Sequence, residues 1–297
     1  MKAARNDLPK KPILVVKAPA KINLGLKVVR RRSDGFHDIV SLCQTVNLCD
    51  TLEFYADRID SMCCTDKNLN HPENLVYQAL RLFRARNEQC NYQPVHILLK
   101  KAIPIGSGLG GGSADAAAVL RAMVKITNSG TEIDTLAQWG ADIGSDVPFL
   151  VRGGTAVMRG RGEIVEPVLW EHKLHYVISY PGVAVDTKWA YDHLRGKKLT
   201  INSPYDRFLC SLGGGRVDTE RLVAVLENDF QPIVERAKPI VADIRAKLQA
   251  AGAIVTSLTG SGSAVYGLFD DRIAASSVYE ELTENGIRSF YCRPYRL

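Results

Sequence analysis

The feature that most constrains the fold of this chain is a glycine-rich segment between an apolar run and an alanine-rich run. Residues 106–112 contain five glycines in seven positions, and residues 114–118 read Ala-Asp-Ala-Ala-Ala. Glycine leaves backbone N–H groups accessible because it has no Cβ, and the first N–H groups of a helix are unpaired and partly positive. The pattern therefore predicts a strand at 95–99, a loop that binds a di- or triphosphate, and a helix at 113–126.

Two common phosphate-binding motifs do not match this loop. A Walker A motif is excluded because no Gly-Lys-Ser or Gly-Lys-Thr follows the glycines. A dinucleotide-binding fingerprint lies in the first strand–helix turn of its fold, whereas this segment begins a third of the way along the chain. A flexible surface loop is the remaining alternative, although linkers are seldom enclosed by a proline and an alanine-rich helix.

Length and charge limit the classes of protein that this chain can represent. Its 297 residues suit one large or two ordinary domains, and its apolar fraction of 46% is sufficient for a buried core. The net charge of +6 favours binding of small polyanions. A nucleic-acid partner is not expected, because the basic residues form a run only at 30–32.

The cysteines and the first residues predict a cytoplasmic protein. None of the seven cysteines has the spacing of a zinc site or a redox motif, so we expect reduced thiols. Residues 1–11 are polar and charged, unlike a secretory signal. We expect no membrane partner, because no run approaches the ~20 apolar residues that cross a bilayer. The oligomeric state is left open.

Hydrophobic periodicity predicts an α+β fold with two lobes, at 1–170 and 171–297. In the first lobe we expect strands at 13–16, 22–29, 38–48, 52–55, 149–151, 155–158 and 164–168, and helices at 74–86 and 132–141, the latter capped by Thr131. In the second lobe we expect helices at 187–194, 219–227, 229–237, 239–251 and 271–285, and strands at 176–180, 254–258, 264–269 and 289–295. Loops are expected at 30–37, 195–205 and 212–216.

Three short segments outside the loop carry polar residues that a core does not need. Lys21 lies in the apolar run 19–26, Asp146 precedes a Val-Pro-Phe sequence, and Gly260-Ser261 separates two predicted strands. Each has a simpler interpretation, namely an exposed position on an edge strand, a turn-forming aspartate and an ordinary turn. Beside a polyphosphate loop they indicate phosphoryl transfer, in which an aspartate accepts the proton of a hydroxyl and a lysine stabilises the attacking oxygen.

The order and spacing of these segments resemble the GHMP kinases. The signature segments are 19–25, 104–118 and 258–264, and the similarity spans almost the whole chain. Segments 34–37, 144–148 and 180–182 strengthen it. The resemblance implies a ribosomal-S5-like N-terminal lobe and a ferredoxin-like C-terminal lobe. It also implies an ATP-dependent phosphotransferase that acts on an alcohol, with Lys21 and Asp146 as its catalytic residues.

Within the GHMP kinases, Asp34-Gly35-Phe36-His37 resembles a branch whose substrate carries a cytidine diphosphate group. That branch phosphorylates the substrate's 2-hydroxyl in the non-mevalonate route to isoprenoid precursors. That branch often has tyrosine where this chain has Phe36. Phenylalanine keeps the aromatic face that can stack on a base but lacks the hydroxyl group of tyrosine. The substrate-binding residues that the resemblance implies are Asn23, Phe36, His37, Tyr191, Gly260 and Ser261. The ATP-binding residues that it implies are Asn74, Lys101, Pro104, Gly106, Ser107, Gly108, Leu109, Gly110, Gly111, Gly112, Ser113 and Ala114.

ATP is the cofactor that the resemblance implies, together with Mg²⁺ that arrives on the nucleotide. We assign no protein ligand to the metal, because glycines at 110–112 replace the loop serine that some relatives use. Three alternatives stay open. The chain could be a GHMP kinase of the mevalonate or homoserine type, a non-catalytic sensor with this fold, or a nucleotide-binding module without a second substrate.

Overall fold

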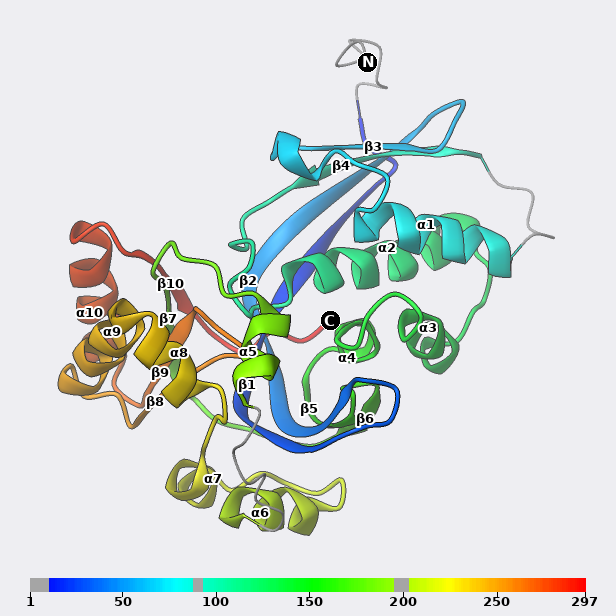
Figure 1. The fold of residues 1–297 in the computed structure, drawn as a ribbon. Coiled ribbons are helices and arrows are strands. Elements are labelled where there is room, and N and C mark those ends of the chain that lie inside the picture. The colour runs from blue at the N-terminus through cyan, green and yellow to red at the C-terminus, as the bar shows by residue number, and fades with distance from the viewer. Residues whose placement is uncertain (1–10, 88–92, 195–202) are drawn as a thin grey trace. The chain divides into compact units, whose positions relative to one another are not determined.

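The computed structural model of this chain describes residues 11–87, 93–194 and 203–297 (Figure 1). The chain divides into two compact units. Unit 1 comprises Met1–Pro19, Cys49–Ile103 and Gly111–Arg152, and unit 2 comprises Ala20–Leu48, Pro104–Gly110 and Gly153–Leu297. The lobe boundary at residue 170 stays a prediction. The predictions made for Cys90, for the first ten residues and for 195–202 lie outside the described residues.

The elements follow one another in the order labelled in Figure 1. Their bounds are β1 (Leu14–Arg31), β2 (His37–Ala56), β3 (Ser61–Cys64), the short 3₁₀ helix η1 (Lys67–Leu69), α1 (Leu75–Arg86), β4 (Val95–Lys100), α2 (Gly111–Thr127), α3 (Ile133–Gly140), α4 (Val147–Arg152), β5 (Thr155–Gly160), β6 (Ile164–Pro167), β7 (His175–Tyr180), α5 (Thr187–His193), α6 (Pro204–Leu212), α7 (Thr219–Val225), α8 (Gln231–Ala237), α9 (Pro239–Ala250), β8 (Val255–Leu258), β9 (Val265–Phe269), α10 (Arg272–Glu284) and β10 (Arg288–Cys292).

Unit 1 contains the strand before the glycine-rich segment and the helix after it. Strand β4 pairs antiparallel with residues 51–56 of β2 and parallel with β3. Helix α2 packs against α1 and α4, and its buried alanines leave room for this close approach. The predicted sequence of strand, glycine-rich segment and helix is confirmed, with α2 beginning at Gly111, two residues earlier than expected.

Unit 2 contains an antiparallel sheet of order β10-β7-β9-β8. Helices α5 to α9 separate β7 from β8, and α10 separates β9 from β10. This βαββαβ order is that of a ferredoxin-like lobe, which the resemblance implied. The same unit pairs residues 39–44 of β2 with β5, and β5 with β6.

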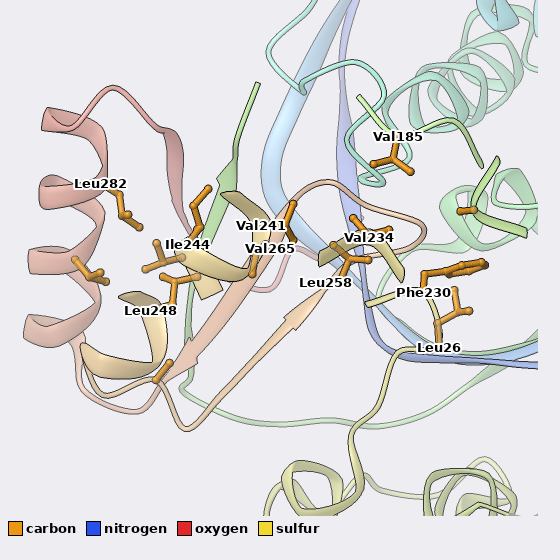
Figure 2. Packing of buried hydrophobic residues seen from close by; sticks show 14 of the residues in the cluster. Leu26, Val185, Phe230, Val234, Val241, Ile244, Leu248, Leu258, Val265 and Leu282 are labelled. Carbon is orange, nitrogen blue, oxygen red and sulfur yellow. The ribbon is translucent and has the colours of Figure 1, made fainter. Parts of the chain in front are cut away.

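The core of unit 2 joins the ferredoxin-like sheet to its helices. In Figure 2, Leu282 of α10 lies close to Ile244 and Leu248 of α9. Burial of each such side chain contributes ~1.5–3 kcal/mol relative to exposure. Leu26 of β1 belongs to the same buried cluster, so the strand that carries Lys21 is anchored in this core.

Two strands are longer than the sequence predicts. Residues 14–16 and 22–29 belong to one strand, β1, which begins at Leu14, one residue later than predicted, and residues 38–48 and 52–55 belong to one strand, β2. Pro19 does not interrupt β1, because its fixed φ suits extended backbone wherever no ladder hydrogen bond is needed. The gap between the predicted strands 38–48 and 52–55 implies a turn at Cys49-Asp50, and this prediction is wrong. Strand β2 continues through both residues, and the buried Asp50 carboxylate accepts the backbone N–H groups of Ala102 and Ile103.

The prediction of a strand at 149–151 is wrong, because these residues belong to helix α4. Pro148 lies in the first turn of α4, where a helix needs no N–H donor. A short apolar run does not distinguish a strand from a buried helix by periodicity, and the choice here depends on packing against α2 and α3.

Two predictions about helix starts are also wrong. Thr131 does not cap α3: the N-cap residue is Glu132, which makes no capping side-chain bond, and the Thr131 hydroxyl contacts Ser129. The loop expected at 195–205 ends early, since α6 begins at Pro204 behind a capping box of Ser203 and Asp206.

Over the described ranges, no helix is long and apolar enough to cross a membrane. The six cysteines that fall within those ranges form no disulfide.

Candidate active site

Unit 2 brings the segment around Lys21 together with the glycine-rich loop and the turn after β8. The backbone N–H of Lys21 donates to the carbonyl of Leu109 at 3.0 Å. The backbone N–H of Asn23 donates to the hydroxyl of Thr259 at 3.0 Å. Three signature segments that lie far apart in the sequence therefore meet within this unit.

The close approach of the loop to this turn requires glycine. A Cβ on Gly108, which has φ +82°, would lie 2.3 Å from the carbonyl oxygen of Thr259. A Cβ on Gly260, with φ +58°, would lie 3.1 Å from the carbonyl oxygen of Gly108. The backbone N–H of Ala264 donates to the carbonyl of Ser107 at 3.0 Å, which holds the two segments together. The Gly-Ser-Gly turn is thus part of the loop's support as well as a connection between strands.

Lys21 is buried, with 4% of its surface exposed, so its interpretation as an exposed edge-strand residue is wrong. Its ammonium group donates to the carboxamide oxygen of Asn23 at 2.5 Å. The Asn23 amide nitrogen in turn donates to the hydroxyl of Ser41 at 2.8 Å. A held ammonium group in a buried, polar setting can stabilise negative charge that develops on a nearby oxygen.

The predicted base-binding residues make two contacts through their aromatic rings. The rings of His37 and Tyr191 stack with centroids 4.6 Å apart and planes at 18°. Phe36 is 52% exposed, and the guanidinium of Arg161, a residue that sequence analysis did not single out, lies 5.0 Å from its ring centroid. Tyr191 belongs to helix α5, and this helix is joined to the turn after β8 by a hydrogen bond between the hydroxyl groups of Thr187 and Ser261, 3.0 Å apart.

Unit 1 assembles the remaining predicted residues near the first turn of α2. A Cβ on Gly112 would lie 3.5 Å from Leu75 at the start of α1, and a Cβ on Gly144 would lie 3.8 Å from the hydroxyl of Ser113. Asp146 follows Gly144 by two residues and directly precedes α4. The segment that contains Asp146 therefore lies beside the first turn of α2.

Asn74 and Lys101 both use their side chains within unit 1. The Asn74 amide caps α1 and donates to the carbonyl of Leu69 at 2.9 Å. The Lys101 ammonium group donates to the carboxylates of Asp50 and, at 2.8 Å, Asp115. Sequence analysis missed Asp50. The sequence does contain a signal for the burial of Asp50. Alternate residues of a strand share one face, and the neighbours of Asp50 on its face, residues 48 and 52, are leucines.

The predicted site residues thus fall into two groups. Unit 2 holds Lys21, Asn23, Phe36, His37, Tyr191, Gly260, Ser261 and the loop residues 104–110, and unit 1 holds Asn74, Lys101, Gly111, Gly112, Ser113, Ala114 and Asp146. The functional roles of these residues, including the joint action of Lys21 and Asp146, stay predictions.

Comparison with known proteins decides the family. Residues 74–154 match the model of the GHMP kinases N-terminal domain, and residues 218–288 match that of the GHMP kinases C-terminal domain. A 4-diphosphocytidyl-2-C-methyl-D-erythritol kinase from Bacillus cereus (strain AH187) is 36% identical over 281 residues, which cover 93% of each chain. The chain belongs to the 4-diphosphocytidyl-2-C-methyl-D-erythritol kinase family of GHMP kinases. It is therefore a phosphotransferase that uses ATP.

Solved structures agree with membership of this kinase family. A crystal structure of 4-(cytidine 5'-diphospho)-2C-methyl-D-erythritol kinase has a TM-score of 0.74 and 30% identity, and the match covers 94% of this chain and 98% of that chain. The mevalonate kinase of Methanococcus jannaschii has a TM-score of 0.71 at 14% identity, over 97% of this chain and 100% of that chain. The second likeness shows the shared GHMP kinase fold alone.

Proposed function

We propose that this chain transfers the γ-phosphoryl group of ATP to the 2-hydroxyl of 4-diphosphocytidyl-2-C-methyl-D-erythritol. The observation that carries the proposal is the 36% identity over 93% of the chain with a kinase named for that substrate. The mevalonate-type alternative has less support, because the likeness to a mevalonate kinase is 14% in identity.

Lys21 and Asp146 are the catalytic residues in this proposal. An aspartate can accept the proton of the attacking hydroxyl, and an ammonium group can stabilise the oxygen as its negative charge develops. The burial of Lys21 and its hydrogen bond to Asn23 support a held, charged group. Little covalent chemistry is required of a kinase, so orientation of the hydroxyl and electrostatic stabilisation supply most of the rate.

The glycine-rich loop and the first turn of α2 bind the ATP phosphates in this proposal. Unpaired N–H groups at a helix start donate to phosphate oxygens, and the helix dipole favours their negative charge. Mg²⁺ accompanies the nucleotide, bound by its phosphates. In the part of the chain that the structure describes, no three His, Cys, Asp or Glu side chains converge to hold a metal ion.

The cytidine group binds near Phe36, His37 and Tyr191 in this proposal. Asn23, Gly260 and Ser261 are further substrate-binding residues. Support comes from the stacked rings of His37 and Tyr191 and from the exposed face of Phe36. A histidine offers one donor and one acceptor to a base edge. A cytoplasmic location is supported by the use of ATP and by the described cysteines, which form no disulfide.

The test is a phosphorylation assay with Mg-ATP and a panel of alcohols. We expect phosphorylated 4-diphosphocytidyl-2-C-methyl-D-erythritol as the product, with the phosphate on the 2-hydroxyl by ³¹P and ¹H nuclear magnetic resonance. Consumption of mevalonate or homoserine alone would overturn the substrate and leave the family intact. Binding of ATP and CDP without any product would indicate a sensor.

Two variants test the proposed roles. Lys21→Met and Asp146→Asn should each lower kcat ~10²–10⁴-fold while CDP binding stays near wild type, because each removes a group that acts mainly in the transition state. Asp142→Asn is the matched control, since Asp142 is an exposed aspartate of the same segment that pairs with Arg86 at the surface. A wild-type kcat in either test variant would remove that residue from the mechanism.

A further inference from the structure

Unit 1 contains a buried charge cluster that the proposed chemistry does not use directly. Lys101 donates to the carboxylates of Asp50 and Asp115. The side chains of Asp50, Lys101 and Asp115 are 0%, 9% and 3% exposed, respectively. The cluster joins β2, the segment after β4, and α2, because these three elements contribute one member each.

Asp50 is the anchor of this cluster. One of its oxygens accepts the backbone N–H groups of Ala102 and, at 2.9 Å, Ile103, and the other accepts from Lys101. Asp115 has fewer partners, since its Oδ1 is buried and makes no hydrogen bond with any described residue. Burial accordingly raises the pKa of the Asp115 carboxyl well above its ordinary value, against the opposing effect of Lys101.

The cluster offers little positive charge to a phosphate. Two carboxylates contact one ammonium group, so the formal charge of Lys101 is balanced before any nucleotide binds. Burial by itself lowers the pKa of Lys101, but the two carboxylates raise it by more, so the ammonium form persists. Lys101 is therefore poorly suited to the direct ATP contact that the resemblance implied.

The cluster does reach the first turn of α2. A Cβ on Gly111, the first residue of α2, would lie 3.2 Å from Lys101 Nζ and 3.0 Å from a side-chain methyl carbon of Ile103. The backbone of the first turn thus rests directly on Lys101 and Ile103. Asp115, one turn later in the same helix, is held by the same ammonium group.

We propose that Asp50 and Lys101 act as a pair of positioning residues for ATP, which set the first turn of α2 against the phosphates without touching the nucleotide. This inference rests on the proposed function, because it takes that turn as part of the phosphate site. A pair that acts as a unit has effects that are not additive, whereas a lysine that binds ATP directly gains from the loss of its carboxylate partner. The two cases therefore differ in the sign of the Asp50 effect.

The experiment compares Asp50→Asn, Lys101→Met and the double variant. ATP affinity is measured by calorimetry with a non-hydrolysable ATP analogue, and KM is measured for both substrates. Each single variant should weaken ATP binding about tenfold, and the double variant should bind ATP no more weakly than either, since a misplacement of about 1 Å can cost as much as 10²-fold. The KM of the cytidine substrate should not change. Lys100→Met is the matched control, because the neighbouring Lys100 pairs with Glu53 at the surface.

Three results would overturn the proposal. Tighter or unchanged ATP binding in Asp50→Asn, with weaker binding in Lys101→Met, would show that Lys101 contacts the nucleotide. An equal rise in KM for ATP and for the cytidine substrate, or a lower melting temperature with no change in ATP binding, would reduce the cluster to a structural role. If Lys101→Met does not fold, Asp50→Asn decides by itself, because its amide oxygen still accepts the two backbone N–H groups. A wild-type protein that binds ATP but phosphorylates no alcohol would contradict the proposed function and leave this comparison valid.

Discussion

At the scale of single residues, Gly108 has the tightest surroundings in the phosphate loop. Its φ of +82° is unfavourable for other residues, and the Thr259 carbonyl oxygen occupies the space that a Cβ would need. Backbone atoms form both sides of this contact, so no side-chain rotation can relieve it. The loop can therefore approach the backbone of Thr259 this closely only because residue 108 has no side chain.

Gly108→Ala should destabilise the protein by about 3 kcal/mol or more and abolish ATP binding, because it adds a backbone clash to left-handed strain. Gly286→Ala is the matched control: Gly286 has φ +76° and no atom within 4 Å of its Cβ position. The control should lose only ~1 kcal/mol, the cost of the strain alone. Urea denaturation measures the free energy of unfolding of both variants. If the two variants lose equal amounts, Gly108→Ala does not create the predicted clash with the Thr259 carbonyl oxygen.

From the lowered pKa of His172 we predict how the free energy of unfolding depends on pH. Burial lowers its pKa from 6.5 to about 4, and its Nδ1 accepts the backbone N–H of Leu174 at 3.1 Å. Between these two pH values the unfolded chain binds a proton that the folded chain does not. The free energy of unfolding should therefore fall as pH drops from 6.5 to 4, by about 2 kcal/mol after allowance for partial exposure.

His172→Gln should remove this part of the pH dependence, because glutamine does not titrate. The measurement is urea denaturation at pH 7 and pH 4.5 for wild type and variant. His71→Gln is the control, since the His71 side chain is 43% exposed, and it should leave the wild-type slope in place. An unchanged slope in His172→Gln would assign the acid sensitivity to other groups.

At the scale of elements, helix α5 connects the predicted base-binding residues to a signature turn. Asp186 caps its first turn, and Ala190 is buried in the core of unit 2. Thr187 meets Ser261 through their hydroxyl groups, and Tyr191 stacks on His37 one turn later. The position of the Tyr191 ring is therefore coupled to the turn after β8.

Thr187→Val should raise the KM of the cytidine substrate about fivefold, which corresponds to the ~1 kcal/mol of one lost hydrogen bond. The KM of ATP should not change. Thr187→Ser keeps the hydroxyl and should restore the wild-type value. Steady-state kinetics with each substrate in turn makes the comparison, and an equal rise in both KM values would mean that the substitution disturbs unit 2 generally.

Element types were predictable wherever local pattern and local packing agree. Helix α1 begins where Asn74 was expected to start it, and α9 ends before Gly252, whose φ is +93°. Helix α4 and the uninterrupted strand β2 were not predictable from local pattern. Pro148 and Asp50 are ordinary breakers of a pattern, and each fits its element only because of contacts with segments elsewhere in unit 1.

At the scale of the whole molecule, the family and the α+β class follow from the chain's order of segments. The ferredoxin-like lobe required the pairing of β7 with both β10 and β9, which joins strands separated by much of the second half of the chain. The division into units also uses three separate stretches of sequence for each unit. No local signal marks such a division, because it depends on which segments pack together.

The sequence by itself determined the strand–glycine loop–helix order, the signature residues Lys21 and Asp146 and the kinase family, because these depend on residue type and spacing along the chain. Only the tertiary structure decided that Lys21 is buried beside Asn23, and that Lys101 is held by Asp50 and Asp115. The physical reason is that burial and ion pairing depend on which distant segments fold against a residue. The sequence shows that a residue is a lysine and carries a charge, whereas the fold determines which carboxylates pair with it.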